Sequence, residues 1–256
     1  MTEIAARVGD YLAIRRALGH KLVTEGRRLE EFAGFVAARG QDSVTIDAAV
    51  AWAATAATPG QVATRLSMVR RFATYLAAFD PAAQIPPQRM LAGGVVRRPP
   101  HVFSRTEIAE LMAAAAASAP ALHAVTFSTL IGLMAATGLR TGEAVRLDRG
   151  DVDLDAGLLL IRYSKYGKSR RIPLHPTTLT ALADYTRRRD QLCPRPGVPA
   201  FLLVGKGERL SDTTTGPTFR RLLAQVGITV PPGRRRPRLH DLRHTFAVTV
   251  PQGFAI

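Results

Sequence analysis

The sequence predicts two domains of different architecture: an all-α helical bundle, followed by a mainly α domain that contains a small antiparallel β-hairpin. Three observations support this division. Helical periodicity runs through the first ninety residues, a stretch rich in proline and glycine follows, and the clear β-prone runs lie in the second half. A chain of 256 residues, 46% of them hydrophobic, is long enough to give each domain its own core.

The first domain is predicted to be a bundle because its apolar residues recur at helical spacing. Leu29, Phe32 and Val36 lie on one face of a helix, and Thr45 is placed to cap another that runs through IDAAVAWAA. Residues 60–80 predict a longer helix with one continuous apolar stripe. The stripe consists of Val62, Leu66, Val69, Phe72, Leu76 and Phe79.

A linker is predicted where the helical periodicity stops, between Pro81 and Pro100. This segment holds five prolines and the pair Gly93 and Gly94, a composition typical of connecting backbone. We therefore place the first domain at residues 1–92, the linker at 93–103 and the second domain at 104–256.

The second domain is predicted to begin with two helices. Ser104 and Glu107 have the spacing of a capping box, directly before an apolar helical pattern. The next helix runs through LHAVTFSTLIGLMAAT, and Gly138 is placed to end it.

A β-hairpin and two further helices are predicted after these. The hairpin strands are Leu158–Tyr163 and Arg170–Leu174, which flank a polar turn containing Gly167. Helices return at Pro176–Gln191 and Pro217–Val226, with the short apolar run AFLLV between them.

The charge of the chain favours a polyanionic partner. Thirty-five Lys and Arg stand against twenty Asp and Glu, a net charge of +15. The excess is larger in residues 101–256 (+10) than in residues 1–100 (+5), so the second half is expected to hold more of the contacts. Nucleic acid is the leading candidate for this partner.

Other sequence features favour a location in the cytoplasm. No apolar run has the length that a bilayer span needs, and the N-terminus lacks the order of a secretory signal. The lone Cys193 has no partner for an internal disulfide or a cysteine metal site.

The stretch RLHDLRHTFA near the end of the chain holds a candidate for phosphate chemistry. It puts His240 and Arg243 one helical turn apart, beside the core-facing positions Leu239 and Leu242. A solvated helix flank is the usual meaning of such a pair. A zinc site through His240 and His244 is a weaker alternative, because the sequence shows no third ligand and lacks the Glu of the metalloprotease pattern.

Two further stretches hold basic residues where backbone turns are predicted. In ATGLRTGEAVRL, Arg140 stands at a tight corner before a new helix that Thr141 is placed to cap. The predicted hairpin turn YSKYGKSRR presents Lys165 and Lys168. Each stretch, taken alone, is more typical of an ordinary surface than of a site.

The order of these three stretches resembles the catalytic domain of the tyrosine recombinases, also called phage integrases. The resemblance runs over about residues 104–250, and the helical first half resembles the SAM-like core-binding domain of that family. On the family pattern, Arg140 and Arg243 match the two catalytic arginines, Lys165 the hairpin lysine and His240 the histidine.

The resemblance implies how these groups act on a DNA phosphodiester. Two guanidinium groups, Arg140 and Arg243, neutralise charge that gathers on the non-bridging oxygens. Lys165 protonates the departing 5′ oxygen as general acid, and His240 supports a phosphate oxygen or assists the proton transfer. No metal ion or other cofactor is implied.

Duplex DNA is the implied partner, with a homo-oligomer possible on the DNA and no membrane contact. The basic residues expected to touch DNA come from the long helix of the first domain and from the hairpin of the second. They are Arg65, Arg70, Arg71, Lys168, Arg170 and Arg171.

The end of the chain departs from the family pattern. In the family, further helices and a nucleophilic tyrosine follow the H-x-x-R pair, whereas every tyrosine here precedes His240. Pro251 is expected to interrupt the helix, and PQGFAI does not resemble the family tail. The sequence therefore predicts a second domain that is truncated at its C-terminus and inactive on its own.

Two alternatives remain open at this point. In the first, the chain is a DNA-binding remnant or regulator that occupies recombination sites without cutting them. In the second, it is an unrelated basic nucleic-acid-binding protein, in which case Arg140, Lys165, His240 and Arg243 would lie scattered in space.

Overall fold

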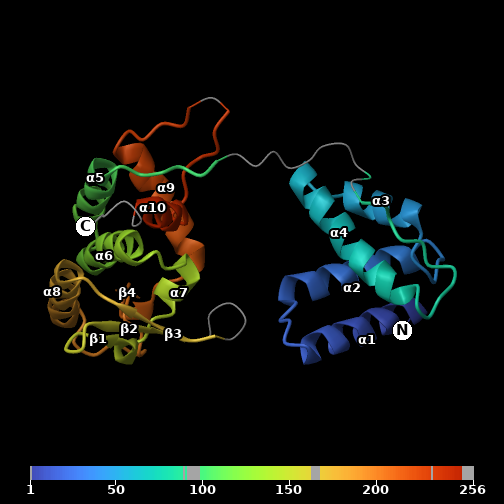
Figure 1. The fold of residues 1–256 in the computed structure, drawn as a ribbon, viewed down its shortest axis with the longest axis horizontal. Coiled ribbons are helices and arrows are strands. Elements are labelled where there is room, and N and C mark those ends of the chain that lie inside the picture. The colour runs from blue at the N-terminus through green and yellow to red at the C-terminus, as the bar shows by residue number, and fades with distance from the viewer. Residues whose placement is uncertain (1, 89, 91–98, 163–167, 232, 250–256) are drawn as a thin grey trace. The chain divides into compact units, whose positions relative to one another are not determined.

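The chain forms two compact units, Met1–Arg97 and Arg98–Ile256, in the computed structural model (Figure 1). Each unit has its own hydrophobic core. The structure describes residues 2–88, 90, 99–162, 168–231 and 233–249. The predicted linker at 93–103 lies partly outside these ranges, so its boundaries stay a prediction.

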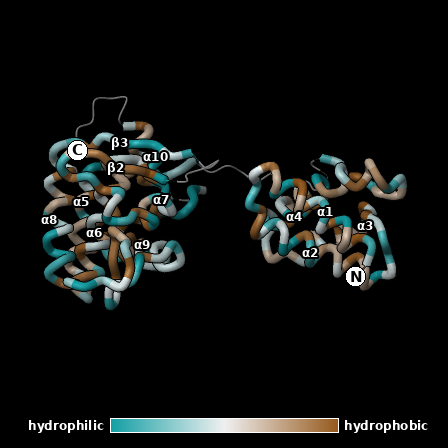
Figure 2. The backbone as a smooth tube through the Cα atoms, turned by 90° about the horizontal axis from the view of Figure 1, so that it is seen from below, coloured by the Kyte–Doolittle hydropathy of each residue, from teal (hydrophilic) through white to brown (hydrophobic). Residues whose placement is uncertain are grey.

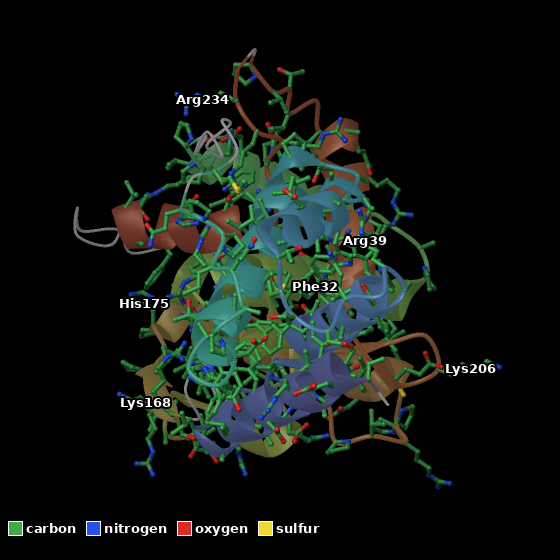
Figure 3. The ribbon with its side chains drawn as sticks, turned by 90° about the vertical axis from the view of Figure 1, so that its right-hand side faces the viewer. Phe32, Arg39, Lys168, His175, Lys206 and Arg234 are labelled. Atoms are coloured by element: carbon green, nitrogen blue, oxygen red, sulfur yellow. The ribbon has the colours of Figure 1, made fainter. Side chains whose placement is uncertain are left out.

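The described part of the first unit is a bundle of four helices. They are α1 (Glu3–Ala17), α2 (Val23–Ala37), α3 (Ile46–Ala54) and α4 (Pro59–Leu76). The core is aromatic: Phe32 packs on Trp52 at 5.2 Å between ring centroids, and Phe72 meets Tyr11 edge to face at 5.7 Å. Figure 3 labels Phe32 among the side chains that fill this interior. Thr45 caps α3 as predicted, because its hydroxyl oxygen accepts the Ala48 N–H at 3.1 Å.

The apolar stripe of α4 is confirmed except at its end. Leu66, Val69, Phe72 and Leu76 are buried. The prediction for Phe79 was wrong, since its side chain is 57% exposed. The helix ends at Leu76 and the chain turns there, which takes Phe79 off the helical face that the stripe follows.

The segment after α4, where the helical periodicity stops, packs onto the first unit. Gln84 donates its backbone N–H to the Val44 carbonyl at 2.8 Å, and its side-chain oxygen accepts the Ile46 N–H at 2.9 Å. The Arg70 Nε atom donates to the Pro86 carbonyl at 2.7 Å. Residues 81–88 therefore belong to the first unit. Hydrogen bonds hold this segment in place, although its sequence shows no helical periodicity.

The described part of the second unit consists of helices around two small antiparallel sheets. The helices are α5 (Arg105–Ala116), α6 (Ala121–Thr137), α7 (Thr141–Val145), α8 (Pro176–Leu192), α9 (Asp212–Gln225) and α10 (Asp241–Thr249), with a short 3₁₀ turn at Arg149–Asp151. The strands are β1 (Val152–Asp153), β2 (Leu158–Ile161) and β3 (Arg170–Pro173) in one sheet, and β4 (Leu203–Val204) and β5 (Glu208–Arg209) in the other. This confirms the predicted fold class.

Helix α6 is the centre of the second unit. It contacts α5, α8 and α10, and its buried positions run round most of its circumference.

Brown, hydrophobic stretches alternate with teal ones along the helices of both units, as amphipathic packing requires (Figure 2). None of the described helices is long and apolar enough to cross a membrane.

The predicted hairpin is present. Strand β2 pairs antiparallel with β3, with Leu159 opposite Ile172 and Ile161 opposite Arg170. Strand β1 pairs with β2 as a third strand, which the sequence did not predict because two residues are too few to show a strand pattern. The turn, with Tyr163 and Gly167, lies outside the described residues.

The helix boundaries agree with the sequence signals at most ends. The capping box of Ser104 and Glu107 is formed, with reciprocal bonds of 3.1 and 2.7 Å, and Gly138 ends α6. The predicted start of α9 at Pro217 was wrong. Ser211 caps the helix by accepting the Thr213 N–H at 3.2 Å, so Pro217 lies inside it.

Gly138 is required at the end of α6. Its φ is +62°, and a Cβ built there would lie 2.4 Å from Cδ1 of Phe246 on α10. We predict that Gly138→Ala lowers the free energy of unfolding by about 2–4 kcal/mol, from left-handed strain plus overpacking. Urea unfolding measures this. Gly150→Ala is the control, because an added Cβ meets nothing within 4 Å there, and an equal loss in both variants would contradict the argument.

Candidate active site

The site begins at the corner between α6 and α7. Gly138 reverses the chain, and Arg140 follows as the N-cap residue of α7, one position earlier than the predicted cap at Thr141. The Arg140 backbone N–H donates to Glu143 Oε2 at 3.0 Å. This bond to the first turn of α7 fixes the backbone of Arg140 at the corner.

A buried carboxylate holds two arginine side chains at this corner. The Glu143 side chain is 2% exposed, and its Oε1 accepts Arg140 Nη1 at 2.8 Å. Arg170 on β3 binds the same carboxylate with both terminal nitrogens, at 3.1 and 2.8 Å. Glu143 thus ties α7 to the strand that leads out of the hairpin turn.

Arg243 joins this group from α10. Its Nη1 donates to the Gly138 carbonyl, which places the guanidinium beside the α6–α7 corner. Loss of water contacts is the main cause that lowers the pKa of Arg243, and the charge of Arg140 lowers it further. Glu143 opposes the shift. The guanidinium groups of Arg140 and Arg243 therefore lie close enough to influence each other electrostatically.

The sequence pattern predicted His240 on the helix, but it lies immediately before α10, which begins at Asp241. Its ring meets that of His244 edge to face, with 5.3 Å between centroids. Partial loss of water lowers the pKa of His240, and His244, Arg243 and Arg140 lower it further by repulsion. The lowered pKa favours the neutral imidazole of His240, in which one ring nitrogen carries no proton.

The N-terminus of α10 is pinned by a second buried carboxylate. Asp241 is fully buried, accepts the Arg238 N–H at 2.9 Å and pairs with the Arg235 guanidinium. Further along, the Thr245 hydroxyl oxygen accepts the Phe103 N–H at 2.9 Å. These contacts fix the helix that positions His240 and Arg243.

The structure brings together three of the four residues that the sequence predicted for catalysis. Arg140, His240 and Arg243 lie within electrostatic reach of one another. Lys165 lies outside the described residues. A scattered arrangement of the three is thereby excluded.

The residues predicted to bind DNA from the hairpin divide into two kinds. Lys168 and Arg171 are exposed, and Lys168 lies at the periphery of the side-chain view (Figure 3). Arg170 points inward to Glu143 instead, so its charge supports the site, and its contact with DNA stays a prediction.

The three arginines of α4 each have a partner within the first unit. Arg65 lies over the Trp52 ring at 4.7 Å and donates to the Trp52 carbonyl, which joins α4 to α3. Arg70 binds the segment after α4, and Arg71 pairs with Glu25 at 2.7 Å. Contact with DNA by these side chains stays a prediction.

Sequence reasoning missed Glu143 and Asp241 as the organisers of the site. Both had a readable signal. Glu143 stands three residues after Arg140, which is capping-box spacing, and Asp241 begins a helix. Neither signal shows that the carboxylate is buried or which arginine outside its own helix it binds.

The comparison with known proteins decides the family. Residues 101–252 match the phage integrase family. The chain belongs to this family. It is similar to y4rB of Sinorhizobium fredii, named as an integrase/recombinase, with 39% identity over 96% of this chain and 81% of that protein. The tyrosine recombinase XerD of Caulobacter vibrioides is 29% identical over 96% of this chain and 82% of its own length.

Solved structures of phage-integrase relatives have the same fold. One is the Tn1549 transposon integrase in complex with a circular intermediate DNA. The match covers 100% of this chain and 88% of the integrase chain, with a TM-score of 0.71 and 15% identity. A lambda integrase dimer bound to a COC′ core site covers 95% of this chain and 88% of its own at 0.66 and 20%.

We predict that Arg170→Ala destabilises the second unit more than Arg171→Ala. Removing Arg170 takes two hydrogen bonds from a buried carboxylate, whereas Arg171 is exposed on the same strand. The expected loss is about 1–2 kcal/mol for Arg170→Ala, discounted for its partial exposure, and under about 0.5 kcal/mol for Arg171→Ala. Urea unfolding compares the two, and equal losses would refute the bracing role of Arg170.

We also predict that His240 titrates below pH 6.5 in the folded chain. Because its folded pKa is lowered, the folded state resists protonation, and this contribution destabilises the chain as pH falls through 6.5. His244→Gln removes one repelling imidazole and is expected to raise the His240 pKa. NMR titration of the ring carbons measures both, and an unchanged midpoint in His244→Gln would contradict the assigned coupling.

Proposed function

We propose that this chain binds duplex DNA and seats one backbone phosphate between Arg140 and Arg243, with His240 beside it. The observation that carries the proposal is the convergence of these groups from α7 and α10 on one partly dehydrated place. The net charge of +15 and the DNA complexes of the Tn1549 and lambda integrases support DNA as the ligand.

The proposed chemistry is site-specific strand cleavage and rejoining, as in tyrosine recombinases. Arg140 and Arg243 hold charge that develops on the non-bridging oxygens, in a geometry fixed by Glu143 and the Gly138 carbonyl. His240, whose lowered pKa favours the neutral imidazole, accepts or passes a proton at a phosphate oxygen. Lys165 is the proposed general acid for the 5′ oxygen. The site is proposed to work in a homo-oligomer on DNA.

The proposed activity of the 256-residue polypeptide stops short of cleavage. Its five tyrosines are Tyr11, Tyr75, Tyr163, Tyr166 and Tyr185, and all precede His240. Tyr185 is buried and binds Thr126 and Leu203, and Tyr11 lies in the core of the first unit. We therefore propose that these residues bind a recombination site without forming a phosphotyrosyl link on their own.

Binding to a labelled DNA duplex at several salt concentrations tests the first part. We expect affinity to fall steeply, with a log–log slope near −0.9 for each phosphate contacted. Arg140→Ala and Arg243→Ala are each expected to reduce the slope by about one. A flat salt response of the unmodified chain would refute DNA binding through phosphates.

A nicked suicide substrate tests the second part. The 256-residue chain is expected to give no covalent protein–DNA band. Fusing a family-type C-terminal segment that bears the nucleophilic tyrosine is expected to produce the band, and Arg140→Ala or Arg243→Ala in that fusion to lower its rate about 10²-fold or more. A covalent band from the unmodified chain would overturn the non-cleaving proposal, and peptide mapping would identify the linked tyrosine.

A further inference from the structure

A groove beside the candidate site is lined by arginines that the family match does not explain. It lies between α9 and the segment before α10, and its volume is about 620 Å³. Phe219, Pro237 and Leu239 are buried members of its lining, so its floor is apolar. Arg220, Arg235, Arg236 and Arg238 supply its positive charge. We name it the arginine groove.

Three of these arginines have their charge available to a ligand. Arg220, Arg236 and Arg238 are exposed, and none of them forms a side-chain hydrogen bond or ion pair within the described part of the chain. Arg235 differs, because it pairs with the buried Asp241. One arginine therefore anchors the segment while its neighbours face outward.

The groove is continuous with the candidate active site. Its lining includes Thr141, which follows Arg140, and His240. Among its described lining residues, Asp212 is the one carboxylate, and it lies beside Gly142, where the Arg146 guanidinium is equally close. The surface next to the catalytic groups is thus predominantly positive.

We propose that the arginine groove is a phosphate-binding track that holds the DNA backbone next to the phosphate seated on Arg140 and Arg243. This rests on the proposed function. Spaced guanidinium groups suit successive phosphates, and an apolar floor suits the deoxyribose between them. Arg235, paired with Asp241, keeps the segment in place and transmits the position of the track to α10, which holds Arg243.

The test compares two double variants of the full chain that lose the same charge. Arg236→Ala with Arg238→Ala removes the track, whereas Arg188→Ala with Arg195→Ala removes two exposed arginines at α8 and just after it, elements that do not line the groove. Affinity for a random-sequence duplex is measured against salt. We expect the groove variant to reduce the slope by about two and the control variant to leave it nearly unchanged.

The outcomes separate this proposal from the proposed function. Steep binding by the unmodified chain with equal slopes in both double variants would overturn the track and leave DNA binding standing. No binding by the unmodified chain would overturn both. A third variant, Arg236→Lys with Arg238→Lys, is expected to retain the salt slope, because each lysine still neutralises one phosphate. Loss of the slope in the lysine variant would contradict a track that works through charge.

Discussion

The arrangement of the candidate site depends on one buried carboxylate. Glu143 binds Arg140 on its own helix and Arg170 on a strand that is distant in the sequence. A carboxylate buried this deeply needs charged partners to remain ionised. Its two ion pairs therefore hold Arg140 and Arg170 beside it. Ion pairs as well as packing therefore place the α7 corner and the β2–β3 hairpin relative to each other.

A second buried carboxylate repeats the device at α10. Asp241 holds Arg235 and the backbone of Arg238, which fixes the entry to the helix that positions His240 and Arg243. Each half of the site thus pairs one buried acid with a structural arginine, Arg170 in one case and Arg235 in the other. The neighbouring arginines Arg171, Arg236 and Arg238 are exposed at the surface. An excess of arginine in the composition is divided in this way between internal support and external charge.

The meeting of the two halves depends on a glycine. Gly138 ends α6 in a left-handed conformation, its carbonyl accepts a hydrogen bond from Arg243, and the Phe246 ring packs where a side chain would otherwise be. Arg140 follows this turn in the chain, and Arg243 binds its carbonyl, so the same turn of backbone positions both arginines. This explains how two arginines about a hundred residues apart in the chain come to share one partly dehydrated place.

The sequence by itself determined the fold class, most helix ends and the family, because these depend on local signals. Capping at Ser104 and Thr45, the terminator Gly138 and the ordered motifs around Arg140 and His240 are all readable within a few residues. Only the tertiary structure decided which arginines are structural. Arg65, Arg170 and Arg235 look like Arg171 and Arg236 in the sequence. They differ because a carboxylate or a carbonyl of another segment, 13, 27 and 6 residues away respectively, lies within reach of the first three. Pairing between segments leaves no periodicity in the sequence, so it becomes visible only when the segments pack together.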